Sequence, residues 1–279
     1  DDMKTKSKIL WNAFIVLFIA ACSTGINIFS DSDELSFGKQ FDKEIRSNSK
    51  EYPVYKGNPA VKDYIDKRIF REVLNSPEVK KAATYNYQME IIQNDTILNA
   101  FAVPGGYIYV YTGLIKYLDS EAALAGVIGH EIAHVERRHA TQRITEAYGI
   151  QILAGIALGN NPSQIASMAA NMFSGLALLA NSRSNEDESD QYSLKYLSST
   201  RFYPGSVKFF FEKLRDDGKI SRGGEGIATF LSTHPDPIAR ISSTEQRLKE
   251  MGLDVKDYKA TGNGIFKDEY KKNILSKLP

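Results

Sequence analysis

The spacing of hydrophobic and polar residues predicts a mainly helical chain with one short sheet. In five segments the hydrophobic residues have the spacing of one helix face, and these segments span residues 34–50, 58–74, 121–148, 184–198 and 236–251. Between the second and third segments a looser alternation predicts three strands, which span residues 85–92, 97–103 and 107–111. The last two strands meet at Pro104-Gly105-Gly106, a sequence typical of a tight turn. We therefore expect an α+β fold that is predominantly helical and forms one domain.

Two further segments need separate interpretations. Residues 150–180 are rich in Ala, Leu, Ile and Met, but polar side chains interrupt them repeatedly. We therefore expect two buried helices there, and not a hairpin that dips into a membrane. Residues 216–226 carry five charged residues and four glycines, so we expect a mobile loop.

The first 22 residues have the features of a secretory signal. Lysines at residues 4–8 precede an apolar run over residues 9–21, which is shorter than the about 20 residues of a comfortable transmembrane helix. The run ends at Ala20-Ala21-Cys22, which resembles a bacterial lipobox and implies lipidation of Cys22. By the same resemblance, Ser23 favours the outer membrane. The alternative is an ordinary cleavage site that a cysteine happens to follow.

Composition and charge narrow the possible chemistry. The 279 residues include 35 Lys and Arg against 34 Asp and Glu, and the net charge of +1 lacks the basic excess of a nucleic-acid-binding protein. A single Cys excludes a disulfide scaffold and any cysteine-rich metal site. A metal centre in this chain would therefore use carboxylates and some of the four His.

The strongest chemical motif is His130-Glu131-Ile132-Ala133-His134, inside the predicted helix 121–148. Residues four apart lie on one helix face, so the two imidazoles can converge on one Zn²⁺. Glu131 lies about 100° around the helix axis, where it can reach a water in the open coordination position and act as general base. Hydrophobic neighbours surround the motif, and histidines in such a setting need a specific role.

A catalytic zinc needs a third protein ligand, and the candidates are His139, His234 or a downstream carboxylate. On a continuous helix His139 is too far along the axis from the first histidine to share the ion. Glu186 and Glu188 are two residues apart, so only one of them can face the metal. Glu186 has Asp190 one turn later, which can accept the free N–H of a zinc-bound histidine. We therefore expect Glu186 as the third ligand and Asp190 as the acceptor behind a zinc-bound histidine. Glu188 has no such carboxylate partner one turn later.

Four separated stretches resemble a known family. They are Asn99–Gly106, Gly129–Val135, Ser182–Glu186 and Leu231–Pro235. Together they resemble the gluzincin metalloproteases of the CAAX-prenyl-protease and HtpX-like family, in particular its periplasmic lipoprotein members. The resemblance implies a zincin-type fold, with an active-site helix under a small β-sheet. It also implies one Zn²⁺ per chain, with His130, His134 and Glu186 as ligands and Glu131 as the base.

The resemblance also indicates where a substrate binds. In zincins the edge strand above the active-site helix pairs with an extended substrate through backbone hydrogen bonds. By resemblance Asn99 and the carbonyl of Ala100 are the candidate contacts, and an ordinary hairpin is the alternative. The chain departs from the family at Ser189, where Ala is usual, and we do not expect so small a change to disturb the zinc.

Peptide hydrolysis builds negative charge on the carbonyl oxygen, and a donor placed there lowers the barrier. His234 is the candidate for this catalytic role. It could instead serve as a fourth ligand that holds the enzyme latent, or simply bond to the backbone of its loop. Arg183 and Arg240 are weaker oxyanion candidates, and we assign His139 a structural role.

These inferences predict a zinc-dependent endopeptidase that cleaves unfolded or misassembled cell-envelope proteins in extended form. The expected location is the bacterial periplasm, with a lipid anchor in the outer membrane, no nucleic-acid partner and no predicted oligomeric state. The alternative is a periplasmic chaperone or assembly factor for outer-membrane proteins that holds a structural zinc. The predicted boundaries are a signal peptide at 1–21, a lipid-anchored tether at 22–33, the metalloprotease domain at 34–255 and a C-terminal extension at 256–279.

Overall fold

The structure is a computed structural model that describes residues 27–160, 164, 181–222 and 225–279. The predicted signal peptide, the lipidation site Cys22 and most of the predicted helical pair beyond residue 160 lie outside the described residues. Within the described ranges, no helix combines the length and the apolar character needed to cross a membrane.

A three-stranded sheet forms one layer of the fold. Its strands are β1 (Gln88–Ile92), β2 (Ala100–Val103) and β3 (Tyr107–Tyr111), in the order β1-β3-β2. The predicted hairpin is confirmed, since β2 pairs antiparallel with β3 through a turn in which Gly105 and Gly106 have φ values of +76° and +105°. These values favour glycine. Strand β1 pairs parallel with β3, so β2 lies at an edge of the sheet.

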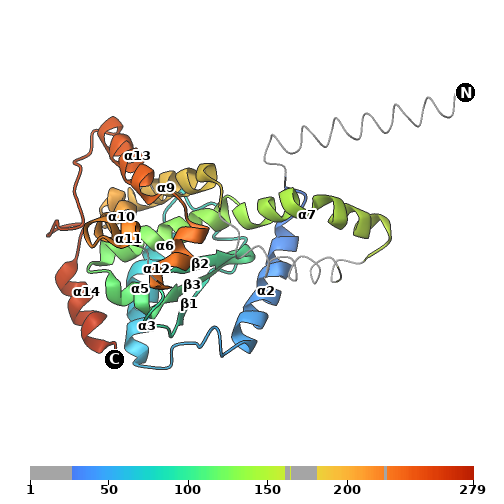
Figure 1. The fold of residues 1–279 in the computed structure, drawn as a ribbon, viewed down its shortest axis with the longest axis horizontal. Coiled ribbons are helices and arrows are strands. Elements are labelled where there is room, and N and C mark those ends of the chain that lie inside the picture. The colour runs from blue at the N-terminus through green and yellow to red at the C-terminus, as the bar shows by residue number, and fades with distance from the viewer. Residues whose placement is uncertain (1–26, 161–163, 165–180, 223–224) are drawn as a thin grey trace, which may run out of the picture.

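Helix α6 (Glu121–Glu136) runs beneath the sheet, and every one of its residues is buried. Ser120 caps its first turn by accepting a hydrogen bond from the Ala123 N–H. Figure 1 shows α6 between the sheet and helices α9 (Arg183–Leu197) and α10 (Val207–Asp216), and it contacts both helices and β2. A helix buried on all sides needs no hydrophobic stripe, which explains why its hydrophobic and small residues are spread around the axis.

The prediction of one continuous helix over residues 121–148 was wrong. The chain breaks after α6, where Arg138 has a φ of +64°, and α7 (His139–Ala157) begins in a new direction. The Arg138 guanidinium donates to Glu34 Oε1 at 2.8 Å and to the Phe29 carbonyl at 2.5 Å. These contacts, with residues about a hundred positions earlier, hold the break in place.

The other helices cover the sheet and α6 (Figure 1). They are α2 (Asp31–Ser47), α3 (Pro59–Ile65), a π-helical turn (Asp66–Phe70), α4 (Arg71–Leu74), α5 (Thr112–Tyr117), α11 (Lys219–Arg222), α12 (Glu225–Thr233), α13 (Pro237–Glu250) and α14 (Lys267–Asn273). The helices predicted near residues 34–50, 58–74, 184–198 and 236–251 are confirmed within a few residues. The expected loop at 216–226 was wrong, because α11 and the first turn of α12 occupy much of it.

Residues 256–279 pack onto the same core as α6. Ile265, Tyr270 and Ile274 are fully buried, and the Tyr270 hydroxyl donates to a carbonyl of α5 at 2.7 Å. The carbonyl of Ile265 accepts from the Ala122 N–H at 3.2 Å. Because Ala122 lies in the first turn of α6, the C-terminal segment helps to hold the start of this helix in position.

Candidate metal centre

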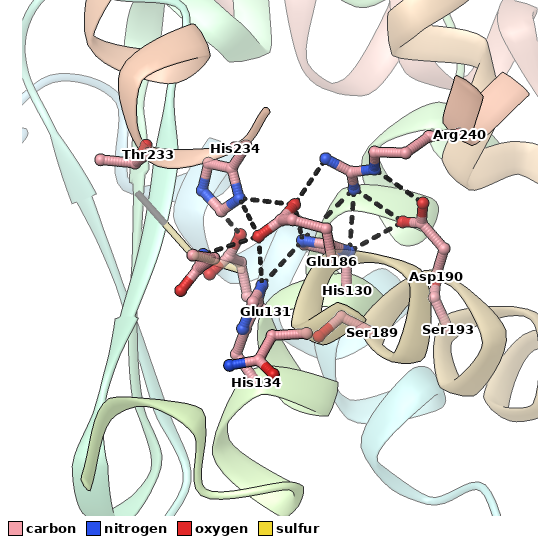
Figure 2. A network of polar contacts seen from close by, with 12 residues as sticks. His130, Glu131, His134, Glu186, Ser189, Asp190, Ser193, Thr233, His234 and Arg240 are labelled. Atoms are coloured by element: carbon pink, nitrogen blue, oxygen red, sulfur yellow. Dashed lines mark hydrogen bonds and ion pairs between the residues drawn. The ribbon is translucent and has the colours of Figure 1, made fainter. Parts of the chain in front are cut away.

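Helix α6 carries three of the predicted site residues. His130, Glu131 and His134 are 4%, 3% and 8% exposed. The Nε2 atoms of the two histidines lie 2.9 Å apart, because residues four apart share one helix face. Both rings therefore point to the same place beside the helix (Figure 2).

Helix α9 brings two carboxylates to this place. It begins after Ser182, whose side chain caps its first turn. Glu186 Oε2 lies 3.4 Å from His130 Nε2, and Glu186 Oε1 lies 3.3 Å from His134 Nε2. One turn later, Asp190 Oδ1 lies 2.9 Å from His130 Nδ1. The structure thus places Glu186 between the two rings and Asp190 behind His130, as expected for a ligand and its supporting carboxylate.

The donor set fits a zinc ion. One atom each from His130, His134, Glu186 and His234 lie within 4.8 Å of one another, and all four residues are buried. Tetrahedral ligands with bonds of about 2.0–2.1 Å lie about 3.4 Å apart. The contacts among the two α6 histidines and Glu186 measure 2.9, 3.3 and 3.4 Å, which is close to that spacing. Two histidines and a glutamate are a ligand set of catalytic zinc sites.

The ionisation of Glu186 and His134 favours a cation at this point. Burial opposes the charge on Glu186, but the nearby His234, Arg240 and His130 hold its pKa well below the usual range, so it is a carboxylate. Burial lowers the pKa of His134 well below its usual value, which keeps this ring neutral and its lone pair available. Burial raises the pKa of Glu131, the direction that suits a group that exchanges protons near neutral pH.

Arg240 of α13 ties the two carboxylates of α9 together. Its Nε and Nη2 donate to Asp190 at 2.7 Å each, and its Nη1 lies 2.5 Å from Glu186 Oε2. At 4% exposed, it balances negative charge inside the fold (Figure 2). Arg183, the other oxyanion candidate among the arginines, has a side chain that is 81% exposed and pairs with Asp236 at 3.4 Å.

Comparison with known proteins now decides the family. A model of peptidase family M48 matches residues 61–248. The chain belongs to this family. It is 31% identical to a putative beta-barrel assembly-enhancing protease of Vibrio cholerae over 226 residues. These residues cover 78% of this chain and 44% of the relative. It is 30% identical over 231 residues to the beta-barrel assembly-enhancing protease of Escherichia coli, covering 80% of this chain and 45% of the relative.

A mitochondrial relative matches a shorter part of the chain. The mitochondrial metalloendopeptidase OMA1 of Arabidopsis thaliana is 34% identical over 145 residues, which cover 52% of this chain and 28% of the relative. The chain therefore spans less than half the length of these curated relatives. Peptidases of family M48 are zinc metalloendopeptidases, and a mainly helical fold with a small sheet and a buried group that could hold a metal ion is consistent with this class.

His234 lies inside the buried ligand group and not in an exposed loop. It is 4% exposed, its Nδ1 lies 3.1 Å from both carboxylate oxygens of Glu186, and its Nε2 lies 4.0 Å from Glu131 Oε1. Its ring stacks on Phe230 with 4.9 Å between centroids. Both roles considered for His234, oxyanion donor and fourth ligand, are within reach of this position.

Asn181 is a site residue that the sequence analysis missed. Its Nδ2 donates to Glu186 Oε1 at 2.6 Å, and its backbone N–H donates to the Thr233 carbonyl at 2.9 Å. It therefore links Glu186 to the segment that carries His234. No periodic pattern marks this residue; the only signal was its place just before the helix cap Ser182.

A cavity of about 660 Å³ opens beside the ligand group. Its lining includes Glu131, His134, His234, Asn99 and residues of the edge strand β2 and of α2. The Asn99 carbonyl accepts from β3, and its side chain accepts from the Ala100 N–H at 2.9 Å. Because hydrogen-bonding residues alternate along an antiparallel pair, the Ala100 carbonyl faces the outer edge of β2. This is the side on which an added strand would pair.

Proposed function

We propose that the chain is a zinc-dependent endopeptidase in which Glu131 activates water. Glu131 is buried beside the ligand group and is not among the four residues that could hold the ion, and this position carries the proposal. Zinc held by His130, His134 and Glu186 would polarise the peptide carbonyl and lower the pKa of its water toward about 7. Glu131 takes the proton during attack and returns it to the leaving amine.

The cavity and the open edge of β2 support an extended polypeptide as the substrate. A peptide that adds to this edge would form backbone hydrogen bonds, including one to the Ala100 carbonyl, with Asn99 beside it. Strand addition requires an unpaired backbone, so the proposed substrates are unfolded or misassembled proteins. The backbone contacts would tolerate many side chains.

The relatives suggest the cellular setting. Two of them are named as beta-barrel assembly-enhancing proteases of bacteria, so we place this chain in quality control of envelope proteins in the bacterial periplasm. The sequence of the N-terminal segment supports a lipid anchor at Cys22 and an outer-membrane location. Mass spectrometry of the membrane fraction tests the anchor, since wild type should carry a lipid on Cys22. The variant Cys22→Ala should be unlipidated and released from that fraction.

His234 has two proposed roles, which predict opposite effects of one substitution. As a donor to the developing oxyanion, its removal should lower kcat by about 10²–10³-fold, by analogy with other oxyanion donors. As a fourth ligand that holds the enzyme latent, its removal should instead raise the activity of purified protein. The activity of His234→Ala with saturating zinc therefore decides between the two roles.

The decisive test of the endopeptidase proposal is Glu131→Gln. This change keeps the size of the side chain and removes the base, so the variant should bind one zinc per chain, as measured by elemental analysis, and should fail to cleave an unfolded substrate such as reduced casein. Wild-type cleavage that Glu131→Gln leaves unchanged would refute the mechanism. If zinc-loaded wild type cleaves nothing but prevents aggregation of unfolded outer-membrane proteins, the chaperone alternative replaces the proposal.

A further inference from the structure

His139 contacts the ring of His134 but is not among the residues that could hold the ion. Because the chain breaks at Arg138, α7 starts with His139 turned back toward α6. His139 Nδ1 lies 2.9 Å from His134 Nδ1, and the two rings meet edge to face with 4.9 Å between centroids. On the other side of its ring, His139 Nε2 lies 3.0 Å from Glu188 Oε2.

The positions of the protons on these two rings follow from the geometry. His134 directs Nε2 to the ligand group, where the lone pair of that nitrogen must be free for a metal. A neutral imidazole has one N–H, so the proton of His134 is on Nδ1 and is donated to His139 Nδ1. His139 Nδ1 must then be the acceptor, which leaves the proton of His139 on Nε2, facing the Glu188 carboxylate.

We propose that His139 and Glu188 are positioning residues that hold His134 in its metal-binding tautomer and orientation. The chain Glu188–His139–His134 does for the second histidine what Asp190 does directly for His130. A carboxylate behind a ligating histidine raises the basicity of the ligand and fixes its ring. Here a 1%-exposed imidazole stands between the carboxylate and the ligand. The inference rests on the proposed role of His134 as a zinc ligand.

Two further residues contact this chain: Arg137 binds Glu188, and Ser189 lies near His139. Arg137 Nε donates to Glu188 Oε1 at 2.9 Å. This contact orients the carboxylate so that its other oxygen, Oε2, faces His139. Ser189 Oγ lies 3.3 Å from His139 Nδ1, farther than the His134 ring is. If the hydroxyl were the true partner of His139, Ser189→Ala would weaken the site as much as loss of His139 does.

The test measures zinc affinity by competition with a chromogenic chelator, together with the melting temperature of the metal-free protein. Loss of a residue behind a metal ligand weakens metal binding by about 10–100-fold, and we expect this range for His139→Ala. Because Glu188 is partly exposed, Glu188→Ala is the variant that should leave the metal-free fold intact. It should weaken zinc binding by about tenfold, and Glu188→Gln, which retains an acceptor oxygen, should restore part of that loss.

The matched controls are Asp187→Asn and Ser189→Ala, neighbours on the same helix, which should change zinc affinity less than about threefold. Zinc affinity of Glu188→Ala within that same limit would overturn the proposal. So would a loss confined to the melting temperature, which would indicate a purely structural role. The readout needs no peptidase activity, so wild type that binds zinc but cleaves nothing would refute the proposed function and leave this inference standing.

Discussion

Replacing Asp190 with Ala should weaken both the fold and the zinc site, by amounts that can be separated. Asp190 is 2% exposed and contacts three donors: the ring of His130 at 2.9 Å and two guanidinium nitrogens of Arg240 at 2.7 Å each. The substitution removes the acceptor that orients His130. It also leaves the Arg240 guanidinium with Glu186 as its remaining carboxylate partner in this cluster.

The two losses have different sizes. Breaking one side of a buried ion pair costs about 3–5 kcal/mol, and the contact that remains between Arg240 and Glu186 places the expected loss of folding free energy at about 3 kcal/mol. Loss of the group that supports a ligating histidine reduces metal affinity by about 10–100-fold, or about 1.4–2.7 kcal/mol. By linkage, the second amount is added only when zinc is bound. Asp190→Ala should therefore destabilise the zinc-loaded protein more than the metal-free protein.

Urea unfolding with saturating zinc and with a chelator measures both quantities. The matched control is Asp187→Asn on the same helix, because Asp187 forms a half-exposed ion pair with Arg247 worth about 0–1 kcal/mol. This control should unfold like wild type in both conditions. Equal losses for Asp190→Ala with and without zinc would show that Asp190 stabilises the fold without orienting His130, and would refute the reasoning.

Three further outcomes follow from the packing and charges. Gly126→Ala should lower the free energy of unfolding, because the added Cβ would lie 2.5 Å from the backbone nitrogen of Val207. The cost of this overpacking, about 1–3 kcal/mol, outweighs the gain in helix propensity of about 1 kcal/mol. Gly129→Ala, which meets only a serine hydroxyl at 2.8 Å, should cost less, and urea titration giving the reverse order would contradict this. Calorimetry can compare protein with zinc at about a hundredfold its Kd and the same protein with a chelator. The chelator should lower the melting temperature by about 5–10 °C, and an unchanged melting curve would exclude a bound metal. Lys208→Met should cost about 3–5 kcal/mol in urea unfolding because it leaves Glu212 buried without its lysine, whereas adding Glu212→Leu should recover most of the loss.

The main features of the site could be predicted from the sequence because they depend on short spacings within helices. The separation of four residues between His130 and His134, and between Glu186 and Asp190, places each pair on one helix face whatever the rest of the fold does. The hairpin at Gly105 was predictable for a similar reason, because its backbone conformation favours glycine. Each of these predictions needed only the local geometry of one element.

Contacts between distant residues were not predictable in this way. The break at Arg138 depends on Glu34, which lies 104 residues earlier in the chain, and a helix pattern without that contact continues through the break. The same break brings the ring of His139 back to that of His134, a contact that the helix pattern does not predict, although His139 is not among the residues that could hold the ion. The sequence likewise could not show that Arg240 joins the two carboxylates of α9, because its partners are on another helix.

The sequence by itself determined the mainly helical class and predicted the candidate ligand types and the candidate base, since these follow from residue chemistry and from the repeat of a helix. Only the tertiary structure decided that His139 and Glu188 stand behind His134, where the edge of the sheet opens and how His234 approaches Glu186. The physical reason is the separation along the chain between the residues whose contacts decide each feature. A helix fixes neighbours three or four residues apart through its own hydrogen bonds, whereas the surroundings of a buried charge are set by every element that packs against it.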